Sequence, residues 1–230
     1  MKAHTRRPWR ALAIAAVLAG ATPAVASYNR PAPQDAFDPA LLRVEEGRYL
    51  GQAVPNVLVS TESGPARLHA LIAGQPTILL LAYYTCHGPC PTTVQNLARV
   101  LRTVRDPEHR VIVLSFDAND SLDGLRHVKS SLGQLPDGWT FGLLAREESA
   151  RLTGSVGFSF FFSERDRTFV HPSVLVFLSP QGEVMRYLYG TEPRTQDIEL
   201  ALIETRNRVS RLNELGDMVK LTCYRFDPAR

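Results

Sequence analysis

The stretch that decides the fold reads Thr77-Ile-Leu-Leu-Leu-Ala-Tyr-Tyr-Thr-Cys-His-Gly-Pro-Cys-Pro91. Its apolar first half has the length of a strand, which predicts a β-strand buried on both faces. Two cysteines, Cys86 and Cys90, then stand in a Gly/Pro turn, and apolar residues recur at helical spacing from Val94 to Leu101. Pro91 suits the first helical position, which predicts that Cys90 caps the helix. The pattern indicates a strand, a loop with two thiols and a helix, in that order.

The rest of the chain surrounds this unit with further elements. We expect helices at 122–132, 147–153 and 195–207, and strands at 54–60, 110–116, 139–143, 174–178 and 184–189. A small hairpin or extended arm is expected over 158–162 and 167–170. The turn Ser179-Pro-Gln-Gly182 makes the last two strands antiparallel. This order predicts an α/β, thioredoxin-like three-layer fold: a central mixed β-sheet flanked by helices, with N-terminal and hairpin insertions.

Four segments follow from composition. Residues 1–26 resemble a signal peptide, with a basic start, an apolar middle and Ala24-Val25-Ala26 before the expected cleavage point. An uncleaved membrane anchor is the alternative for this segment. Residues 27–45 read as an extended leader, 46–207 as the thioredoxin-like domain, and 208–230 as a C-terminal extension. The expected location is therefore periplasmic or otherwise extracytoplasmic.

The net charge of the chain belongs to this targeting segment. Residues 1–26 hold four basic and no acidic residues, so their removal lowers the formal net charge from +3 to −1. No Lys/Arg cluster remains that would favour nucleic acid as a partner. A role in nucleic-acid binding is not expected.

The cysteine pair carries the chemistry of the expected site. The chain has three cysteines, Cys86, Cys90 and Cys223, which are too few for a disulfide framework. Three intervening residues let the sulfurs of Cys86 and Cys90 converge on one metal ion or bond to each other. A helix N-terminus favours the thiolate form, which both ligates soft metals and exchanges with disulfides. Two packed structural cysteines are the remaining alternative.

A third ligand would have to come from a histidine. His69, His109 and His127 read as surface residues, and His87, between the cysteines, either tunes the thiolates or points to solvent. His171 precedes Pro172, which holds it extended ahead of the strand at 174–178. In a thioredoxin-like sheet that position faces the cysteine loop, so His171 could reach both thiols.

Three stretches together resemble the Sco/SenC family, thioredoxin-fold copper proteins that help to assemble the copper centre of cytochrome c oxidase. They are Tyr84-Thr-Cys-His-Gly-Pro-Cys-Pro91, Val113-Leu-Ser-Phe-Asp117, and His171 before Val174-Leu-Val-Phe-Leu-Ser-Pro-Gln-Gly182. The resemblance covers roughly residues 40–207. It implies that Cys86, Cys90 and His171 bind copper, as Cu(I) or Cu(II), and that Asp117 supports the site. A turn or helix cap is the alternative role for Asp117.

The chain departs from the family pattern in three places. His87 stands where members commonly have proline, Pro172 follows the histidine, and Cys223 lies in a tail that resembles a bacterial subgroup. Cys223 is either a packed residue or an additional thiol. These departures leave the ligand types unchanged.

Three functions are consistent with the two thiols. A copper metallochaperone would need His171 and would hand copper to oxidase subunit II or a similar copper-receiving protein. A thiol-disulfide reductase would need Cys86 and Cys90 alone as catalytic thiols, together with a thiol reductant. A peroxiredoxin-type peroxidase would want a threonine three positions before its reactive cysteine, where Tyr83 and His87 stand instead. The metallochaperone, which is not an enzyme, is the function that we expect.

Overall fold

The computed structural model describes residues 42–86, 89–105 and 108–207. Fifteen elements follow one another within these residues: α1 Glu46–Tyr49, β1 Leu58–Thr61, β2 Gly64–Arg67, α2 Leu68–Ile72, β3 Thr77–Ala82, α3 Pro89–Leu101, β4 Arg110–Ser115, α4 Leu122–Ser131, β5 Trp139–Leu144, α5 Arg146–Ser155, β6 Phe161–Ser163, β7 Thr168–Val170, β8 Val174–Leu178, β9 Val184–Tyr189 and α6 Thr195–Arg206. The expected signal segment, most of the leader, His87 and Cys223 lie outside them. No helix in these ranges is both long and apolar enough to cross a bilayer.

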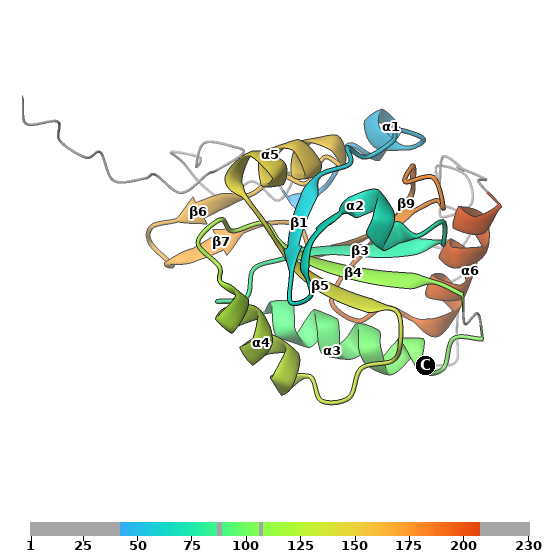
Figure 1. Ribbon diagram of the computed structural model, residues 1–230. Coiled ribbons are helices and arrows are strands. Elements are labelled where there is room, and N and C mark those ends of the chain that lie inside the picture. The colour runs from blue at the N-terminus through green and yellow to red at the C-terminus, as the bar shows by residue number, and fades with distance from the viewer. Residues whose placement is uncertain (1–41, 87–88, 106–107, 208–230) are drawn as a thin grey trace, which may run out of the picture.

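Seven strands form one mixed sheet in the order β2-β1-β5-β4-β3-β8-β9. β3, β4 and β5 are parallel, whereas β8 and β9 run antiparallel to their neighbours. Helices α3 and α4 lie on one side of the sheet in Figure 1, and α1 and α5 lie on the other. The structure confirms the predicted α/β class and its thioredoxin-like layers.

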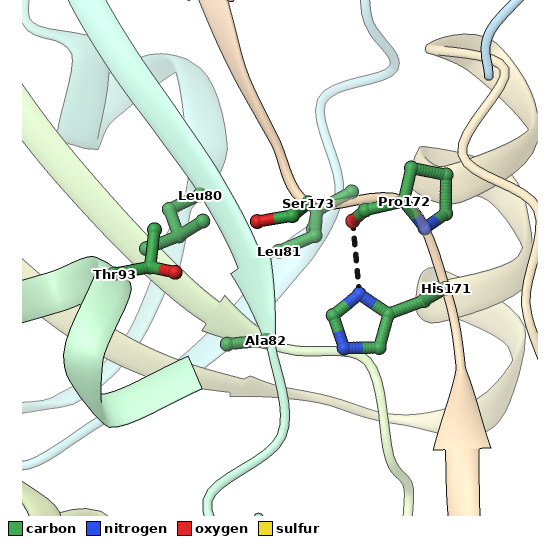
Figure 2. A pocket seen from close by; sticks show the side chains of 7 residues that line it. All are labelled: Leu80, Leu81, Ala82, Thr93, His171, Pro172 and Ser173. Atoms are coloured by element: carbon green, nitrogen blue, oxygen red, sulfur yellow. Dashed lines mark hydrogen bonds between the residues drawn. The ribbon is translucent and has the colours of Figure 1, made fainter. Parts of the chain in front are cut away.

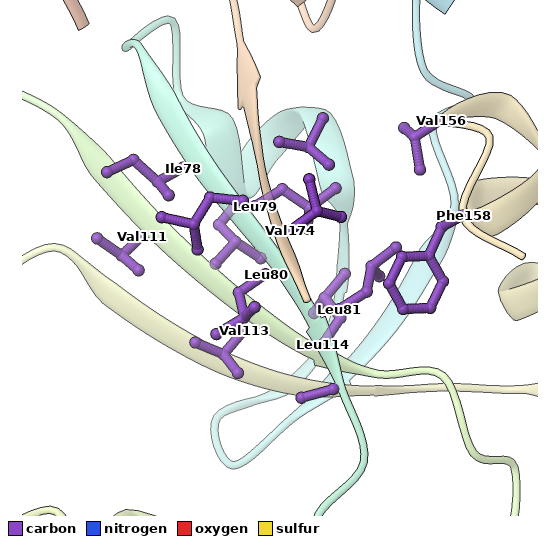
Figure 3. Close-up of a cluster of buried hydrophobic side chains, with 14 of the residues drawn as sticks. Ile78, Leu79, Leu80, Leu81, Val111, Val113, Leu114, Val156, Phe158 and Val174 are labelled. Carbon is purple, nitrogen blue, oxygen red and sulfur yellow. The ribbon is translucent and has the colours of Figure 1, made fainter. Parts of the chain in front are cut away.

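The core is built around β3, whose six residues are all buried. Successive side chains of a strand point to opposite faces, so a strand at the centre of a covered sheet must be apolar throughout. Figure 3 shows Leu79, Leu80 and Leu81 of β3 beside Val113 and Leu114 of β4. Burial on both faces fixes where β3 ends, and therefore where the cysteine loop begins.

Two expectations about local structure are wrong. Helix α3 begins at Pro89, so Cys90 lies in its first turn and does not precede it as a cap. Proline is tolerated at Pro89 and Pro91 because N–H groups of the first turn have no partner within the helix. The strand expected at 54–60 is displaced to Leu58–Thr61 and pairs with β2 as a hairpin.

The small hairpin expected near residue 165 is confirmed as a separate two-stranded sheet. β6 and β7 pair antiparallel, from Phe161 opposite Val170 to Ser163 opposite Thr168. In Figure 1 this β6–β7 arm projects from one end of the main sheet. The chain leaves the arm at Val170 and enters β8 at Val174, so the arm leads directly to His171.

Truncating a buried side chain of the central strand should destabilise the fold far more than truncating an exposed side chain. Leu79 is 0% exposed in β3, whereas Leu58 is 42% exposed in β1. We expect Leu79→Ala to lower the free energy of unfolding by about 2–5 kcal/mol, because it leaves a cavity in the core. Leu58→Ala should change it by less than about 0.5 kcal/mol. Urea denaturation followed by circular dichroism measures both, and equal losses would contradict the central position of β3.

Candidate metal centre

Strand order brings the cysteine loop and His171 to the same edge of the sheet. β8 runs antiparallel to β3 with Leu80 opposite Leu175. Residues that precede β8 therefore lie beside residues that end β3. A small cavity at this junction is lined by Leu80, Leu81, Ala82, Thr93, His171, Pro172 and Ser173 (Figure 2).

Cys86 is held close to the end of β3 by a turn. Its backbone N–H donates to the Tyr83 carbonyl oxygen at 3.4 Å, and the residue is 7% exposed. Cys90 follows in the first turn of α3, where unpaired N–H groups give the helix terminus partial positive charge. A thiolate near this terminus is stabilised relative to a thiol.

Asp120 anchors the loop from the connection between β4 and α4. Its Oδ2 accepts a hydrogen bond of 2.5 Å from the Tyr84 backbone N–H and one of 2.6 Å from the Ser115 hydroxyl. Burial raises the pKa of Asp120, while the bonds from Ser115 and from the backbones of Tyr84 and Thr85 oppose that rise. A carboxylate in the connection after β4 thus holds the residues that lead to Cys86.

The Tyr84 side chain holds the same loop against the backbones of β4 and β5. Its hydroxyl lies 2.8 Å from the Gly142 carbonyl oxygen and 3.0 Å from that of Val113, and accepts from the Gly142 N–H at 3.2 Å. Burial raises the pKa of Tyr84 far above its ordinary value. The phenol is therefore neutral and bonds the start of the cysteine loop to β4 and β5.

The His171 ring has a defined tautomer. Its Nδ1 lies 2.9 Å from the Pro172 carbonyl oxygen, and since a carbonyl only accepts, Nδ1 must carry the proton (Figure 2). In neutral imidazole the lone pair then belongs to Nε2, on the side of the ring away from Pro172. A backbone carbonyl bonded to one ring nitrogen is the usual support for a histidine that binds a metal through the other.

Aromatic rings surround His171. Ring centroids of Phe116, Phe158 and Tyr83 lie 5.3, 5.6 and 6.0 Å from the imidazole centroid. Burial lowers the pKa of His171, whereas its bond to Pro172 and the negative charge of Cys86 raise it. The neutral form, which is the one that ligates metals, is favoured by burial.

The donors fit a soft or borderline metal ion. A thiolate and an imidazole on one sheet edge are ligands that suit copper in either oxidation state. Among the side chains that the structure describes, no three His, Cys, Asp or Glu groups gather into a metal site. The side chain of Cys90 is not among those described, so the three-ligand set stays a prediction.

The other sequence-predicted residues lie as follows. The Asp117 carboxylate accepts from the Asn119 backbone N–H at 3.0 Å and from its side-chain amide at 2.9 Å, which is a turn contact. His127 is exposed on α4. His69 is exposed on α2, not in a polar connection, and its Nε2 lies 3.1 Å from the Val54 carbonyl oxygen.

Sequence reasoning missed Asp120 and the aromatic surroundings of His171. Asp120 precedes Ser121, which caps α4 by accepting from the Gly124 N–H, so in sequence it looks like part of a helix start. The alternating phenylalanines Phe158, Phe160 and Phe162 indicated a strand and gave no sign that Phe158 packs against His171. Both features depend on contacts between distant segments.

Comparisons with known proteins identify the family and agree with the fold. The family model SCO1/SenC matches residues 57–205. A proposed electron transfer protein from Aquifex aeolicus VF5 superposes with a TM-score of 0.64 at 27% identity, covering 69% of this chain and 95% of that one. No curated protein sequence matches the chain.

Two more distant structures share the fold. Arabidopsis thaliana ScoI, solved with copper bound, has a TM-score of 0.57 at 15% identity and covers 68% of this chain and 99% of its own. BsSco has a TM-score of 0.54 at 17% identity and covers 66% of this chain and 92% of its own. It is described as a member of the Sco family of cytochrome c oxidase assembly proteins in which a disulfide switch was identified. Because the family model spans well over half of its residues, this chain belongs to the SCO1/SenC family.

Proposed function

We propose that the protein is a copper metallochaperone that binds copper through Cys86, Cys90 and His171 and delivers it to a cytochrome c oxidase subunit. One observation carries the proposal: the antiparallel pairing of β8 with β3 places His171, which precedes β8, at the end of β3 from which the cysteine loop leaves. Membership of a family whose other members include a copper-bound ScoI and the oxidase assembly protein BsSco supports the choice of metal and pathway.

The proposed site uses the chemistry of its own residues. Cys86 and Cys90 lose their protons to bind copper as thiolates, aided by the N-terminus of α3. His171 supplies the Nε2 lone pair while its Nδ1–H stays bonded to Pro172. Thiolates or imidazoles of the recipient then replace the three ligands in turn, so copper passes without a free ion. The protein would work outside the cytoplasm, as the signal segment at 1–26 predicts.

A thiol-disulfide reductase is the second candidate, and the disulfide switch described for BsSco favours testing it. In that reaction Cys86 and Cys90 become a disulfide, and a disulfide of the recipient gains two electrons and two protons. A thiol reductant would regenerate the pair. This chemistry needs both cysteines and does not need His171.

Replacing His171 separates the two candidates. We expect His171→Ala to weaken copper binding by more than about 100-fold, beyond the roughly 10–100-fold effects of residues that only support ligands. The variant should still exchange disulfides. Competition with a chromophoric copper chelator measures the affinity, and reduction of a model disulfide measures exchange.

His127→Ala is the matched control, because His127 is exposed on α4. It should bind copper and transfer it to an apo-subunit as the unmodified protein does. Equal copper binding by His171→Ala and the unmodified protein would contradict the proposed ligand. If His171→Ala lost copper binding but still reduced the recipient and supported its maturation, the reductase would be favoured.

The anchor at Asp120 gives a second test. Asp120→Ala leaves two donors, the Tyr84 N–H and the Ser115 hydroxyl, without their acceptor. We expect about 1–3 kcal/mol of lost stability and about tenfold weaker copper binding, because the cysteine loop loosens. Asp120→Asn should recover most of both, since an amide oxygen still accepts from Tyr84.

Asp123→Ala is the control for this pair, with a carboxylate on the surface of α4 whose side chain is 91% exposed. It should leave the affinity for copper unchanged. If Asp120→Ala bound copper as tightly as Asp123→Ala, the loop would not depend on this anchor.

A further inference from the structure

We propose that Tyr83 is a positioning residue that fixes the His171 half of the copper site relative to the cysteine half. This inference rests on the proposed copper function. Tyr83 is 6% exposed and follows the last residue of β3. No ligand role is assigned to it; it acts through Cys86 and His171.

Tyr83 contacts the cysteine half of the site through its backbone and the His171 half through its side chain. Its carbonyl oxygen accepts from the Cys86 N–H at 3.4 Å. Its hydroxyl lies 2.6 Å from the Thr168 hydroxyl in β7. Since Thr168 stands three residues before His171, a single residue connects the turn of one ligand to the strand that leads to the other.

The ring of Tyr83 adds packing to this connection. It meets Phe169 of β7 edge-on, with centroids 5.1 Å apart and planes at 71°. It meets the His171 ring at 6.0 Å and 86°, also edge to face. Such pairs favour a defined relative orientation of the rings, so they restrict the direction in which the imidazole points.

The arm needs such a connection because the main sheet does not hold it. Within the described residues, β6 and β7 pair only with each other. A two-stranded hairpin on its own is marginally stable. The position of β7, and of His171 after it, therefore depends on side-chain contacts with the main body, and the bond from Tyr83 to Thr168 is a polar one with defined geometry.

Removing only the hydroxyl tests the proposal. Tyr83→Phe keeps the ring contacts, and Thr168→Val removes the other partner of the same bond. We expect each variant to weaken copper binding by about tenfold and to change the absorption and electron paramagnetic resonance spectra of the Cu(II) form. The double variant should lose no more than either single one, because all three lack the same bond.

Tyr187→Phe is the matched control. The Tyr187 hydroxyl donates to the Val156 carbonyl oxygen at 3.0 Å, so this variant also loses one buried hydrogen bond, away from the site. Its thermal unfolding temperature should fall as in Tyr83→Phe, while copper affinity and spectra stay as in the unmodified protein.

A measurement on the metal-free protein keeps this inference separate from the proposed function. Imidazole nitrogen NMR should show the Nδ1–H tautomer of His171 in the unmodified protein and mixed tautomers in Tyr83→Phe. Unchanged tautomer, affinity and spectra in Tyr83→Phe, or additive losses in the double variant, would overturn the role of Tyr83. If the unmodified protein bound no copper, the proposed function would fail, and the tautomer result would still decide whether Tyr83 orders His171.

Discussion

The site depends on the antiparallel register between β3 and β8. With Leu80 opposite Leu175, the chain that enters β8 must pass the end of β3, where the cysteine loop starts. A parallel β8 would carry His171 to the far edge of the sheet. The turn at Ser179–Gly182 joins β8 to β9, and all five residues of β8 are buried. A one-residue slip of β8 against β3 would interchange the side chains that pack on the two faces of the sheet. The geometry of the sheet therefore determines which distant residue lies at the end of β3, where the cysteine loop begins.

Local contacts then determine the position of the cysteine loop and the protonation state of His171. Asp120 and Tyr84 bond the loop to β4 and β5, and the aromatic rings beside His171 exclude water from one side of the imidazole. Burial favours the neutral ring, and the bond to Pro172 places its lone pair on Nε2. Side chains that are already held in place by such contacts lose less conformational freedom when they bind a metal ion.

The sequence predicted the parts of this arrangement that depend on periodicity and turns. β3, the β8–β9 hairpin and α4 follow from apolar patterns, and His171 follows from the expected sheet order together with the family resemblance. The start of α3 at Pro89 was missed because two prolines compete for the first turn. α2 was missed because Leu68–Ile72 is too short for a periodic signal. The roles of Asp120 and Tyr83 depend on contacts between residues far apart in the sequence: Asp120 and Tyr84 are 36 positions apart, and Tyr83 and Thr168 are 85 positions apart. No local sequence pattern indicates such contacts.

The central claim is that two sulfurs and one imidazole meet on a single copper ion. X-ray absorption spectroscopy at the copper edge of the loaded protein tests it most directly, because it counts sulfur and nitrogen neighbours. The account predicts two sulfur scatterers and one imidazole in the unmodified protein, with the imidazole signal absent in His171→Ala. Copper bound by sulfur alone in the unmodified protein, or an imidazole signal that survives His171→Ala, would contradict it.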